Sequence, residues 1–478
     1  MSDGVTREKT HESAVVESVL LAGAACVPVR ARELTPVQKL FRRQIGLPDA
    51  GAVVMSGHQA QVWHPGVLAK LFALDALVSK STVAHAAWVI VDQDDNDPLA
   101  VFYPACDREG GVRRGQWIAG TSPGAAVGVP TGLRPLVDLR HMSTPPADAA
   151  HADVTTGLAV IAPGWASAAA ARGSLAMQSW NAALFALQEC GVTLTHTPTP
   201  ISALTIGATE LFRDEVRAMT LDAARCVRAY NMATREHPRA RLRPLAEDAA
   251  VGRWELPVWR VAPGAARARV RSAHQRLEWF NASTREWKPA AEGDALAPRA
   301  LLMTYLLRSA GCELFLHGTG GAVYDRAMEA WIDRWRGGTD LAPTGVVSAT
   351  VRWPAAMRPE DIDHAVWAAH AAEFDPAMLG DAAAGAAKRE LARRISQSTS
   401  KADRRSMYMQ MHALLGDARS QHAAALADVQ QRATHACSAR KDAAVLGDRT
   451  YPFPLYGAAA VRALRERVER ALRGESQP

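Results

Sequence analysis

The sequence predicts an α/β protein with a parallel-sheet core, a small connecting insert and a C-terminal α-helical region. Strand–loop–helix–strand patterns at 52–91 and 312–352 predict the two halves of the core, because buried parallel strands alternate with helices. After Pro354 the residues are rich in Ala, Leu, Arg and Gln at helical spacing, which favours a helical hairpin or a coiled coil. The expected divisions are an N-terminal helical arm, the first half of the core, the insert, the second half of the core and the helical region: 1–48, 49–200, 201–297, 298–354 and 355–478.

The composition fits a globular protein and places few limits on its ligands. The 478 residues are 48% apolar and 22% charged, enough for a large core and roughly two to three domains. Lys and Arg number 55 against 49 Asp and Glu, so the formal charge is only +6 and nucleic-acid binding is not favoured. An Arg-rich stretch at 235–276 keeps a nucleic-acid interaction as a rival interpretation.

The cysteines and the hydropathy pattern favour the cytoplasm. The six cysteines are scattered and none forms a Cys-x-x-Cys motif, so we expect reduced thiols and neither a zinc site nor disulfides. No apolar run reaches the ~18 residues of a membrane span. The apolar segment at 13–26 resembles a lipoprotein leader, but Glu17 interrupts it and we interpret it as a short buried helix.

Spacing and helix breakers locate the individual elements. Helix 36–45 is closed by Gly46 and Pro48, and helix 67–78 begins after Pro65, which suits a first helical turn. We expect the other helices at 14–25, 174–190, 209–220, 223–231, 298–308, 322–335, 360–371, 382–395, 404–439 and 458–472. Apolar runs predict strands at 53–55, 86–91, 158–162, 192–196, 254–260, 276–280, 312–316 and 345–352. The Gly- and Arg-rich stretch at 106–135 is expected to consist of loops.

The first core strand runs into the loop Ser56-Gly57-His58-Gln59, and His64-Pro65-Gly66 precedes the next helix. Free N–H groups and the helix dipole at a helix N-terminus attract phosphate or carboxylate groups. We therefore assign Ser56, Gly57, Gln59 and Gly66 to cofactor binding, and His58 and His64 to phosphate or transition-state contacts. The alternative is that the glycines only serve the turn and the histidines only satisfy the strand end.

The second core strand ends in Asp92-Gln93-Asp94-Asp95-Asn96-Asp97, with four carboxylates in six residues. Asp92, Asp94 and Asp95 are candidates to bind Mg²⁺, to hold an amine or a ribose hydroxyl, or to act as a base. Carboxylates repel an anion bound close by, so we expect one loop to take phosphate and the other a cation or a hydroxyl group. A solvated loop with Asp as a helix cap is the alternative.

A second glycine loop, His317-Gly318-Thr319-Gly320-Gly321, lies between a buried strand and a helix. Its glycines let the backbone approach a ligand closely, so we assign all five residues to cofactor binding. The motif is neither a Walker loop nor Gly-x-Gly-x-x-Gly, and a tight turn without a ligand is the alternative.

Several of these motifs together resemble the bacillithiol biosynthesis cysteine-adding enzymes. The resemblance rests on Val53-Val-Met-Ser-Gly-His-Gln-Ala60, on Trp88-Val-Ile-Val-Asp-Gln-Asp-Asp95, on Glu255-Leu-Pro-Val-Trp259 and on the His317–Gly321 loop, and it spans most of the chain. His58 replaces the first Gln of that family's Gly-Gln-Gln-Ala loop, and Asp94 replaces a His of its acidic motif. Val67 stands where the His-x-Gly-His motif of class I synthetases has its second His.

The resemblance implies a Rossmann-like core related to class I synthetases and nucleotidyltransferases, with a C-terminal coiled coil that forms a homodimer. It also implies a ligase that binds ATP or ADP and joins the carboxyl group of cysteine to the amine of glucosaminyl malate. Because the motifs differ, a relative that uses another amino acid and another amine or amino sugar is an equal alternative. A non-catalytic ligand-binding or scaffold protein that keeps the fold is the main rival.

Overall fold

The structure is a computed structural model that describes residues 13–26, 29–80, 84–122, 127–168, 173–338, 340–354 and 356–475. The chain divides into two compact units. Within the described residues, the β/α unit holds 13–103, 115–352 and 449–475, and the helical unit holds 104–114 and 353–448. The first twelve residues of the expected N-terminal arm lie outside the described residues. The predicted mixed α/β class, with parallel strands and a C-terminal helical region, is confirmed.

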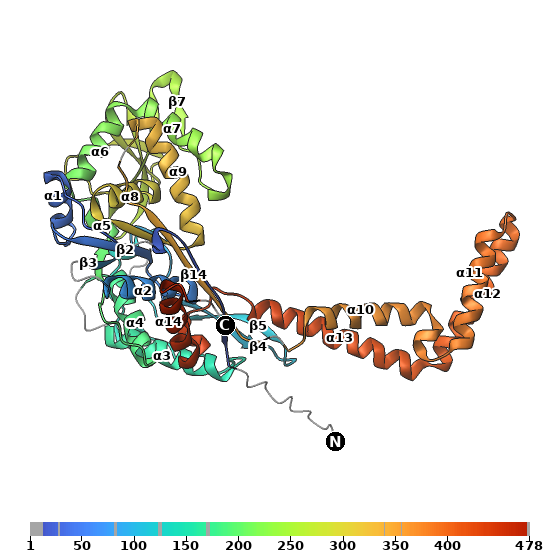
Figure 1. The fold of residues 1–478 in the computed structure, drawn as a ribbon. Helices are drawn as coiled ribbons and strands as arrows, with labels where there is room; N and C mark the ends of the chain where they lie inside the picture. Colours follow the sequence, from blue (N-terminus) through green and yellow to red (C-terminus); the bar gives the residue numbers. More distant parts are fainter. Residues whose placement is uncertain are drawn as a thin grey trace. The chain divides into compact units, whose positions relative to one another are not determined.

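A six-stranded sheet forms the centre of the β/α unit (Figure 1). Its strands lie in the order β1 (Val15–Gly23), β14 (Thr344–Arg352), β13 (Leu314–His317), β2 (Ala52–Gln59), β3 (Ala84–Val91) and β6 (Thr199–Ser202). β1 is antiparallel to β14, and all the other neighbours are parallel. The two halves of the core therefore meet where β13 pairs with β2, with Leu314 opposite Val54.

Helices cover both faces of this sheet. On one face, Val53 and Met55 join a large apolar cluster with α1 (Pro36–Gln44), α8 (Ala300–Leu306) and α9 (Thr319–Arg336). On the other face lies α2 (Pro65–Val78), which packs against α14 (Ala458–Leu472). Trp88 shows the alternation, because its neighbours Ala87 and Val89 belong to the cluster while its own ring lies against Lys70 of α2. Nearly every residue of α2 is buried, as its all-round apolar sequence predicts.

The insert folds as helices and an antiparallel sheet that is separate from the central sheet, as predicted. Its helices are α5 (Ala203–Ile206), α6 (Glu210–Leu221) and α7 (Ala223–Glu236). Its strands are β7 (Glu247–Asp248), β8 (Arg253–Ala262), β9 (Ala265–Ala273), β10 (Arg276–Asn281), β11 (Glu286–Pro289) and β12 (Leu296–Pro298). Ser272 of β9 donates from Oγ to the Thr220 carbonyl at 2.9 Å, which attaches the end of α6 to this sheet.

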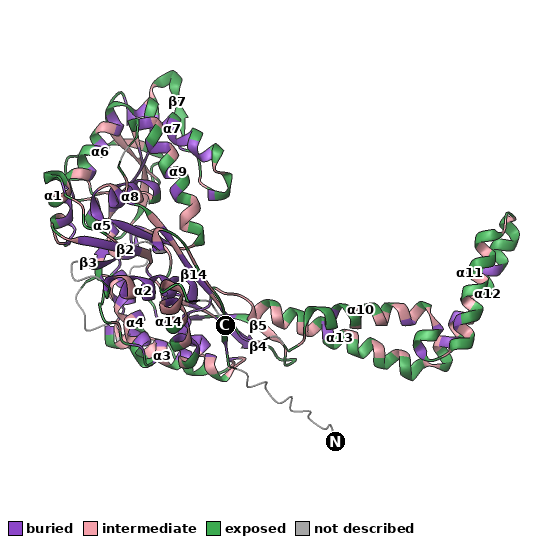
Figure 2. Cartoon of the chain, viewed as in Figure 1, coloured by how far each residue is buried: buried purple, intermediate pink, exposed green. Residues whose placement is uncertain are grey.

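The helical unit contains α10 (Pro359–Phe374), α11 (Ala382–Gln397), α12 (Lys401–Gln421) and α13 (Ala423–Leu446). α10 lies beside α13, and α11 lies beside α12 (Figure 1). These helices bury few side chains, so most of their surface is coloured as exposed or intermediate (Figure 2). The last helix, α14, belongs to the β/α unit, where the 3-10 turn Phe453–Tyr456 before it is buried.

Most of 14–25 forms the strand β1 (Val15–Gly23), followed by the 3-10 turn Ala24–Cys26, and not the predicted buried helix. β1 pairs with β14 along its length, with Val16 opposite Val351 and Leu21 opposite Val347. The β-branched Val15, Val16 and Val19 suit an extended edge strand. The error has a physical reason, since the strand that pairs with this segment lies far along the chain and leaves no local pattern.

Other local expectations are also wrong. Residues 158–162 lie inside helix α3 (Ala152–Ala168), because an apolar run this short fits either structure. Residues 192–196 are not a strand, since the N–H groups of Thr195 and His196 donate to the Asp75 carboxylate. The stretch 106–135, expected to consist of loops, includes β5 (Val112–Ile118), which pairs with β4 (Ala100–Cys106). The expected single helix 404–439 is divided at His422 between α12 and α13. By contrast, the predicted helix 174–190 is present as α4 (Leu175–Glu189).

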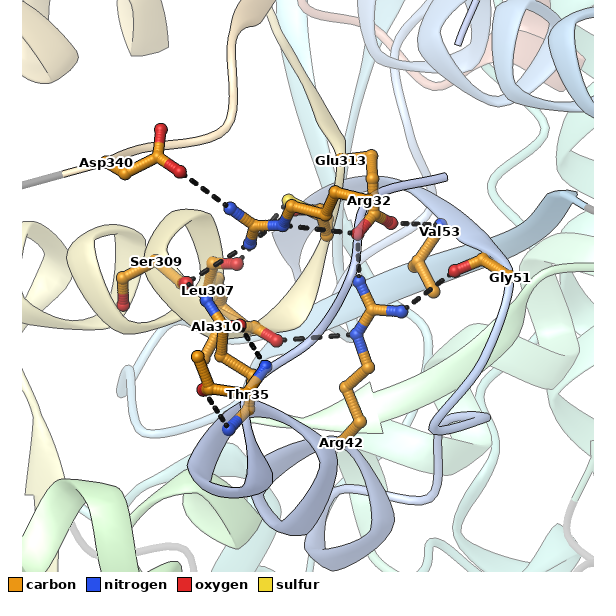
Figure 3. A network of polar contacts seen from close by, with 12 residues as sticks. Arg32, Thr35, Arg42, Gly51, Val53, Leu307, Ser309, Ala310, Glu313 and Asp340 are labelled. Carbon is orange, nitrogen blue, oxygen red and sulfur yellow. Dashed lines mark hydrogen bonds and ion pairs between the residues drawn. The ribbon is translucent and has the colours of Figure 1, made fainter. Parts of the chain in front are cut away.

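A buried polar network secures the end of the sheet at which β2 and β13 begin (Figure 3). Glu313 accepts from Arg42 Nη2 at 2.5 Å and from the Val53 N–H at 2.6 Å. The fully buried Arg42 also donates to the carbonyls of Gly51 (3.1 Å) and Ala310 (3.4 Å). Each buried charge is opposed and hydrogen-bonded, so the network acts as a structural link between α1 and the sheet.

Candidate functional site

The two halves of the core diverge at the junction of β2 and β13. From β2 the chain passes through α2 to β3 on one side, and from β13 it passes through α9 to β14 on the other. In parallel sheets, ligands bind at such a divergence, outside the carboxyl ends of the strands. Ser56 Oγ donates to the Leu316 carbonyl at 2.8 Å, and the strand register places His317 level with Gly57. The predicted loops are wrong as secondary structure: Ser56–Gln59 is the last part of β2, His317 ends β13, and Thr319–Gly321 is the first turn of α9. The two glycine motifs nevertheless lie at the same edge of adjacent strands.

His58 and Lys70 lie at this edge with altered protonation. The buried Lys70 donates from Nζ to the Gly57 carbonyl at 2.6 Å and lies 5.2 Å from the centre of the Trp88 ring. Burial lowers the pKa of Lys70 to about 7. Burial, followed by the charges of Lys70 and His64, holds the pKa of His58 well below its ordinary value, so this imidazole is neutral at pH 7. His58 Nδ1 is buried and has no hydrogen-bond partner among the described residues.

The first backbone N–H groups of α2 already have hydrogen-bond acceptors at the start of the helix itself. His64 is the N-cap: its Nδ1 accepts from the Gly66 N–H at 3.1 Å, and its carbonyl accepts from Val67 (2.9 Å) and Leu68 (3.1 Å). Pro65 has no N–H. A Cβ atom added at Gly66 would also lie 3.0 Å from His64 Cε1 and from Ser348 Oγ. These donors are already used, so the hydrogen bonds do not favour phosphate binding at Gly66.

At the N-terminus of α9, in contrast, the first backbone N–H groups have no hydrogen-bond acceptor among the described residues. Gly318 is its N-cap, and no side chain caps the helix. In the described part of the chain, no acceptor meets the N–H groups of Thr319, Gly320 and Gly321, and the space at the α-carbons of Gly318 and Gly320 is open. Of the two helix starts, this one keeps both the donors and the room that an anionic group needs.

His317 lies beside this helix start against the buried carboxylate of Asp325, which Arg308 also approaches. Its Nε2 lies 2.8 Å from Asp325 Oδ2 on α9, and Arg308 Nη1 lies 3.1 Å from the same oxygen. The imidazole also packs on Phe315, with 4.6 Å between ring centres. A Cβ atom added at Gly321 would lie 2.5 Å from His317 Nδ1, so Gly321 is needed for this close approach. The contacts fix the His317 ring against the first turn of α9.

Asp92 differs from the other candidate carboxylates because it is deeply buried. It accepts from Ser202 Oγ at 2.5 Å and from the Leu204 N–H at 3.1 Å. Burial raises the pKa of Asp92 to about 6, although these hydrogen bonds oppose the shift. A Cβ atom at Gly132 would lie 2.5 Å from Asp92 Oδ2, so the carboxylate is closely covered. Its partners belong to β6 and α5, on the side of β3 away from β2.

Asp94 and Asp95 are joined to the insert. Arg267 of β9 forms ion pairs with both, through Nη1 to Asp94 and through Nη2 to Asp95 at 2.9 Å. Gln59, at the end of β2, donates from Nε2 to Asp94. A Mg²⁺ ion at these carboxylates would have to displace Arg267. Within the described residues, no group of three or more His, Cys, Asp or Glu side chains is arranged to hold a metal ion.

Three tryptophans pack beside His58. The ring centres of Trp63, Trp88 and Trp180 lie 5.0 to 5.9 Å apart. Together with His58 and Ser179 they surround a narrow gap that has no room for a water molecule. Ser179 Oγ, like His58 Nδ1, is buried without a hydrogen-bond partner in the part of the chain that the structure describes. The unpartnered polar atoms single out His58 and Ser179, but the closed gap between them does not form a ligand site by itself.

The structure brings some of the predicted residues together and separates others. The β2–β13 edge gathers Ser56, Gly57, His58, Gln59, His317, Gly318, Thr319, Gly320 and Gly321. Asp94 is linked to this edge through Gln59, whereas Asp92 and Gly66 serve internal packing. Sequence reasoning did not assign Lys70 or Arg267 to the site. A lysine on an otherwise apolar helix was the signal for Lys70, but Arg267 has no local signal that separates it from the other arginines of the insert.

Comparison with known proteins supplies no relative, because no protein-family model matches the sequence and no curated protein matches it. In the part of the chain that the structure describes, no helix is long and apolar enough to cross a membrane. The geometry of the β2–β13 edge is therefore the basis for assigning a function.

Proposed function

We propose that the β/α unit is a Rossmann-like, cytoplasmic enzyme that joins an amino-acid carboxyl group to an amine with the use of ATP, as the resemblance to the cysteine-adding ligases implies. One observation carries the proposal: a neutral His58 with an unpartnered Nδ1 (among the described residues) lies beside buried Lys70 where β2 and β13 diverge. Shifted pKa values and unpartnered polar atoms concentrate at sites of chemistry.

Each group would have a role that suits its surroundings. The N–H groups of Thr319, Gly320 and Gly321 would bind phosphate oxygens of ATP or ADP. His58 would accept the proton that the amine loses as its nitrogen attacks the carboxyl carbon and displaces the phosphate-containing group by which ATP has activated it. Lys70 would position the Gly57–His58 peptide through its hydrogen bond to the Gly57 carbonyl.

The acidic loop would bind the second substrate. Asp94 and Asp95, bridged by Arg267, would hold the amine or the hydroxyl groups of an amino sugar. Mg²⁺ would enter with the nucleotide phosphates, since the loop carboxylates are already paired.

The test is ligation by the full chain. Cysteine and glucosaminyl malate are incubated with ATP, and the amide product is measured by mass spectrometry, with ATP and ADP affinity measured by calorimetry. We expect His58→Ala and Asp95→Ala to lower the ligation rate by roughly 100-fold or more, with an unchanged circular dichroism spectrum. His85→Ala is the matched control, because His85 is an exposed histidine near the opposite end of β3. Normal binding and ligation by both site variants would show that the site assignment is wrong.

A non-catalytic ligand-binding or scaffold protein is the second candidate function. Two observations favour it: α2 closes its own N-terminus, and Arg267 already occupies the carboxylates of Asp94 and Asp95. Thermal-shift measurements separate the two candidates. A melting temperature that rises with ATP or ADP, and does so less in His58→Ala, supports the enzyme. A melting temperature unaffected by nucleotides, cysteine and amino sugars supports the scaffold.

We also infer that the helical unit forms a homodimer. Large apolar side chains are exposed on it, including Trp367 and Phe374 of α10 and Tyr408 and Met409 of α12. Contiguous exposed apolar surface marks an interface with another protein, and Trp367 and Phe374 lie two helical turns apart on one face of α10. Light scattering of the full chain should give twice the monomer mass, and Trp367→Glu combined with Met409→Glu should restore the monomer. A monomeric wild-type protein would exclude the dimer.

A further inference from the structure

A large cavity lies between α6 and the insert sheet, away from the β2–β13 edge. Its volume is about 920 Å³, within the range of sites for drug-sized ligands. The buried Phe212, Val216 and Thr220 of α6 line it at spacings of four residues. Leu277 of β10 and the segment 289–296 line it from the insert, and Leu133 and Leu204 from the β/α core. We call this space the α6 cavity.

The walls of the α6 cavity are held in place by hydrogen bonds. Thr209 caps the start of α6 through the Phe212 N–H at 3.2 Å, and Ser272 Oγ holds the Thr220 carbonyl near its end. In the opposite wall, Asp294 accepts from the Ala291 N–H at 2.9 Å and from Arg260 Nε at 2.8 Å. The walls of the cavity are therefore already ordered in the folded protein. Binding of a ligand would not carry the entropy cost of ordering them.

The rim of the α6 cavity carries an excess of positive charge. Arg213, Arg217 and Arg276 line it and are exposed. Arg217 pairs with Asp214, but no carboxylate among the described residues pairs with Arg213 or Arg276. The acidic residues of the lining are Asp294, which is neutralised by Arg260, and Glu292, which has no ion-pair partner in the described part of the chain. Two unpaired arginines thus face one unpaired carboxylate.

We propose that the α6 cavity binds an amphipathic organic anion, with its apolar body against Phe212, Val216 and Leu277 and its anionic group at Arg213 and Arg276. Apolar walls with a few polar groups at one end are the usual design of a small-molecule site. Guanidinium groups bind carboxylate and phosphate groups well because their donors form a planar fork. The proposal is independent of the ligase function, since none of the residues assigned to that function lines this cavity.

The test uses dodecanoate as the probe, with dodecanol and dodecyltrimethylammonium as uncharged and cationic probes of the same chain length. Binding to the full chain is measured by calorimetry below the micellar concentration of the two charged probes and below the solubility limit of dodecanol. We expect one dodecanoate per chain, bound at least about tenfold more tightly than either other probe, because only the carboxylate gains the arginine contacts. Equal affinity for the three probes, or no saturable binding of dodecanoate, would overturn the proposal.

Variants locate the probe within the chain. Arg213→Glu and Arg276→Glu should each weaken dodecanoate binding roughly threefold to tenfold, whereas Arg225→Glu, on an exposed position of α7, should leave it unchanged. Glu292→Gln should strengthen binding by about twofold to threefold, because it removes the unpaired carboxylate of the rim. Leu221→Glu places a charge on the apolar lining and should abolish binding, and it tests the wall without disturbing the core because Leu221 is 57% exposed. Equal effects of Arg213→Glu and Arg225→Glu would place the probe elsewhere and overturn the proposal.

Discussion

The two ends of the central sheet bury polar groups in opposite ways. Where β2 and β13 begin, Glu313, Arg42 and the Val53 N–H satisfy one another (Figure 3). Where the same strands end, Lys70 is buried with a backbone carbonyl as its acceptor, and His58 Nδ1 has no partner among the described residues. The complete pairing at the first end stabilises the fold. At the second end, His58 Nδ1 is left without a hydrogen bond to the described residues. Burial of charged groups therefore does not by itself locate a site in this chain. At the second end it coincides with an unpartnered imidazole nitrogen, among the described residues, beside a lysine whose pKa is lowered.

The two helix starts at this second end sharpen the difference. α2 uses the N–H groups of Gly66, Val67 and Leu68 on His64, while the first N–H groups of α9 meet no acceptor in the described part of the chain. Both start one loop after a core strand and both carry a histidine and glycines, so their sequences suggested similar roles. At the start of α2, the His64 side chain folds back and accepts a hydrogen bond from the backbone. No side chain among the described residues does this at the start of α9.

The largest effect on stability is expected at the end where the network is complete. Glu313→Ala leaves Arg42 buried without its counter-charge and the Val53 N–H without an acceptor, which should lower the free energy of unfolding by about 3–5 kcal/mol. Urea denaturation followed by circular dichroism measures the loss. Arg43→Ala, which removes an exposed ion pair with Asp49, should leave the free energy of unfolding nearly unchanged. Similar losses in the two variants would contradict a structural role for the network.

At the other end, Lys70 should make stability rise with pH. Its pKa is about 7 in the folded protein against an ordinary 10.5, so between these values the unfolded chain binds more protons and the free energy of unfolding increases with pH. The increase should be several kcal/mol and is measured by urea denaturation at successive pH values from 7 to 10. Lys70→Met should remove the rise, and the exposed Lys39→Met should not. An unchanged slope in Lys70→Met would show that the ammonium group is not desolvated.

Asp92 should have the reverse effect at lower pH. Its pKa is about 6 when folded and 3.8 ordinarily, so between these values the folded protein binds more protons and the free energy of unfolding falls as pH rises. The fall should be roughly 2 kcal/mol from pH 4 to pH 6. Asp92→Asn should abolish it, and the exposed Asp97→Asn in the same loop should not. The same denaturation series at acidic pH measures the difference, and a fall that persists in Asp92→Asn would assign it to another group.

The smallest effect on stability is expected for Arg267→Gln. The ion pairs of Arg267 are partly exposed, so their loss should change the free energy of unfolding by about 1 kcal/mol or less. The same variant frees the carboxylates of Asp94 and Asp95, so Mg²⁺ affinity measured by calorimetry should increase. Arg269→Gln, on the same strand, is the control. An Mg²⁺ affinity that stays the same would mean that Arg267 does not compete with a cation at this loop.

Much of the fold and part of the site could be predicted from local patterns. The helix from Pro65, the strands that contain Val53 and Leu314, and the glycine loop after His317 follow from apolar runs and helix breakers within short windows. Asp92 shows the limit of such reasoning. It was grouped with Asp94 and Asp95 by sequence position, yet its carboxylate is directed to Ser202 and Leu204 on the far side of β3.

The sequence by itself determined the α/β class, the insert strands that do not continue the main sheet, the helical C-terminal region and the glycine motifs that follow two core strands, because periodicity and turn residues act over a few neighbouring positions. Only the tertiary structure decided that 15–23 pairs with β14, that α14 packs on α2, and that Arg267 meets the acidic loop. It also decided which helix start stays open. These outcomes depend on residues distant in the chain, whose contacts are selected by the packing of the whole unit and have no local signature.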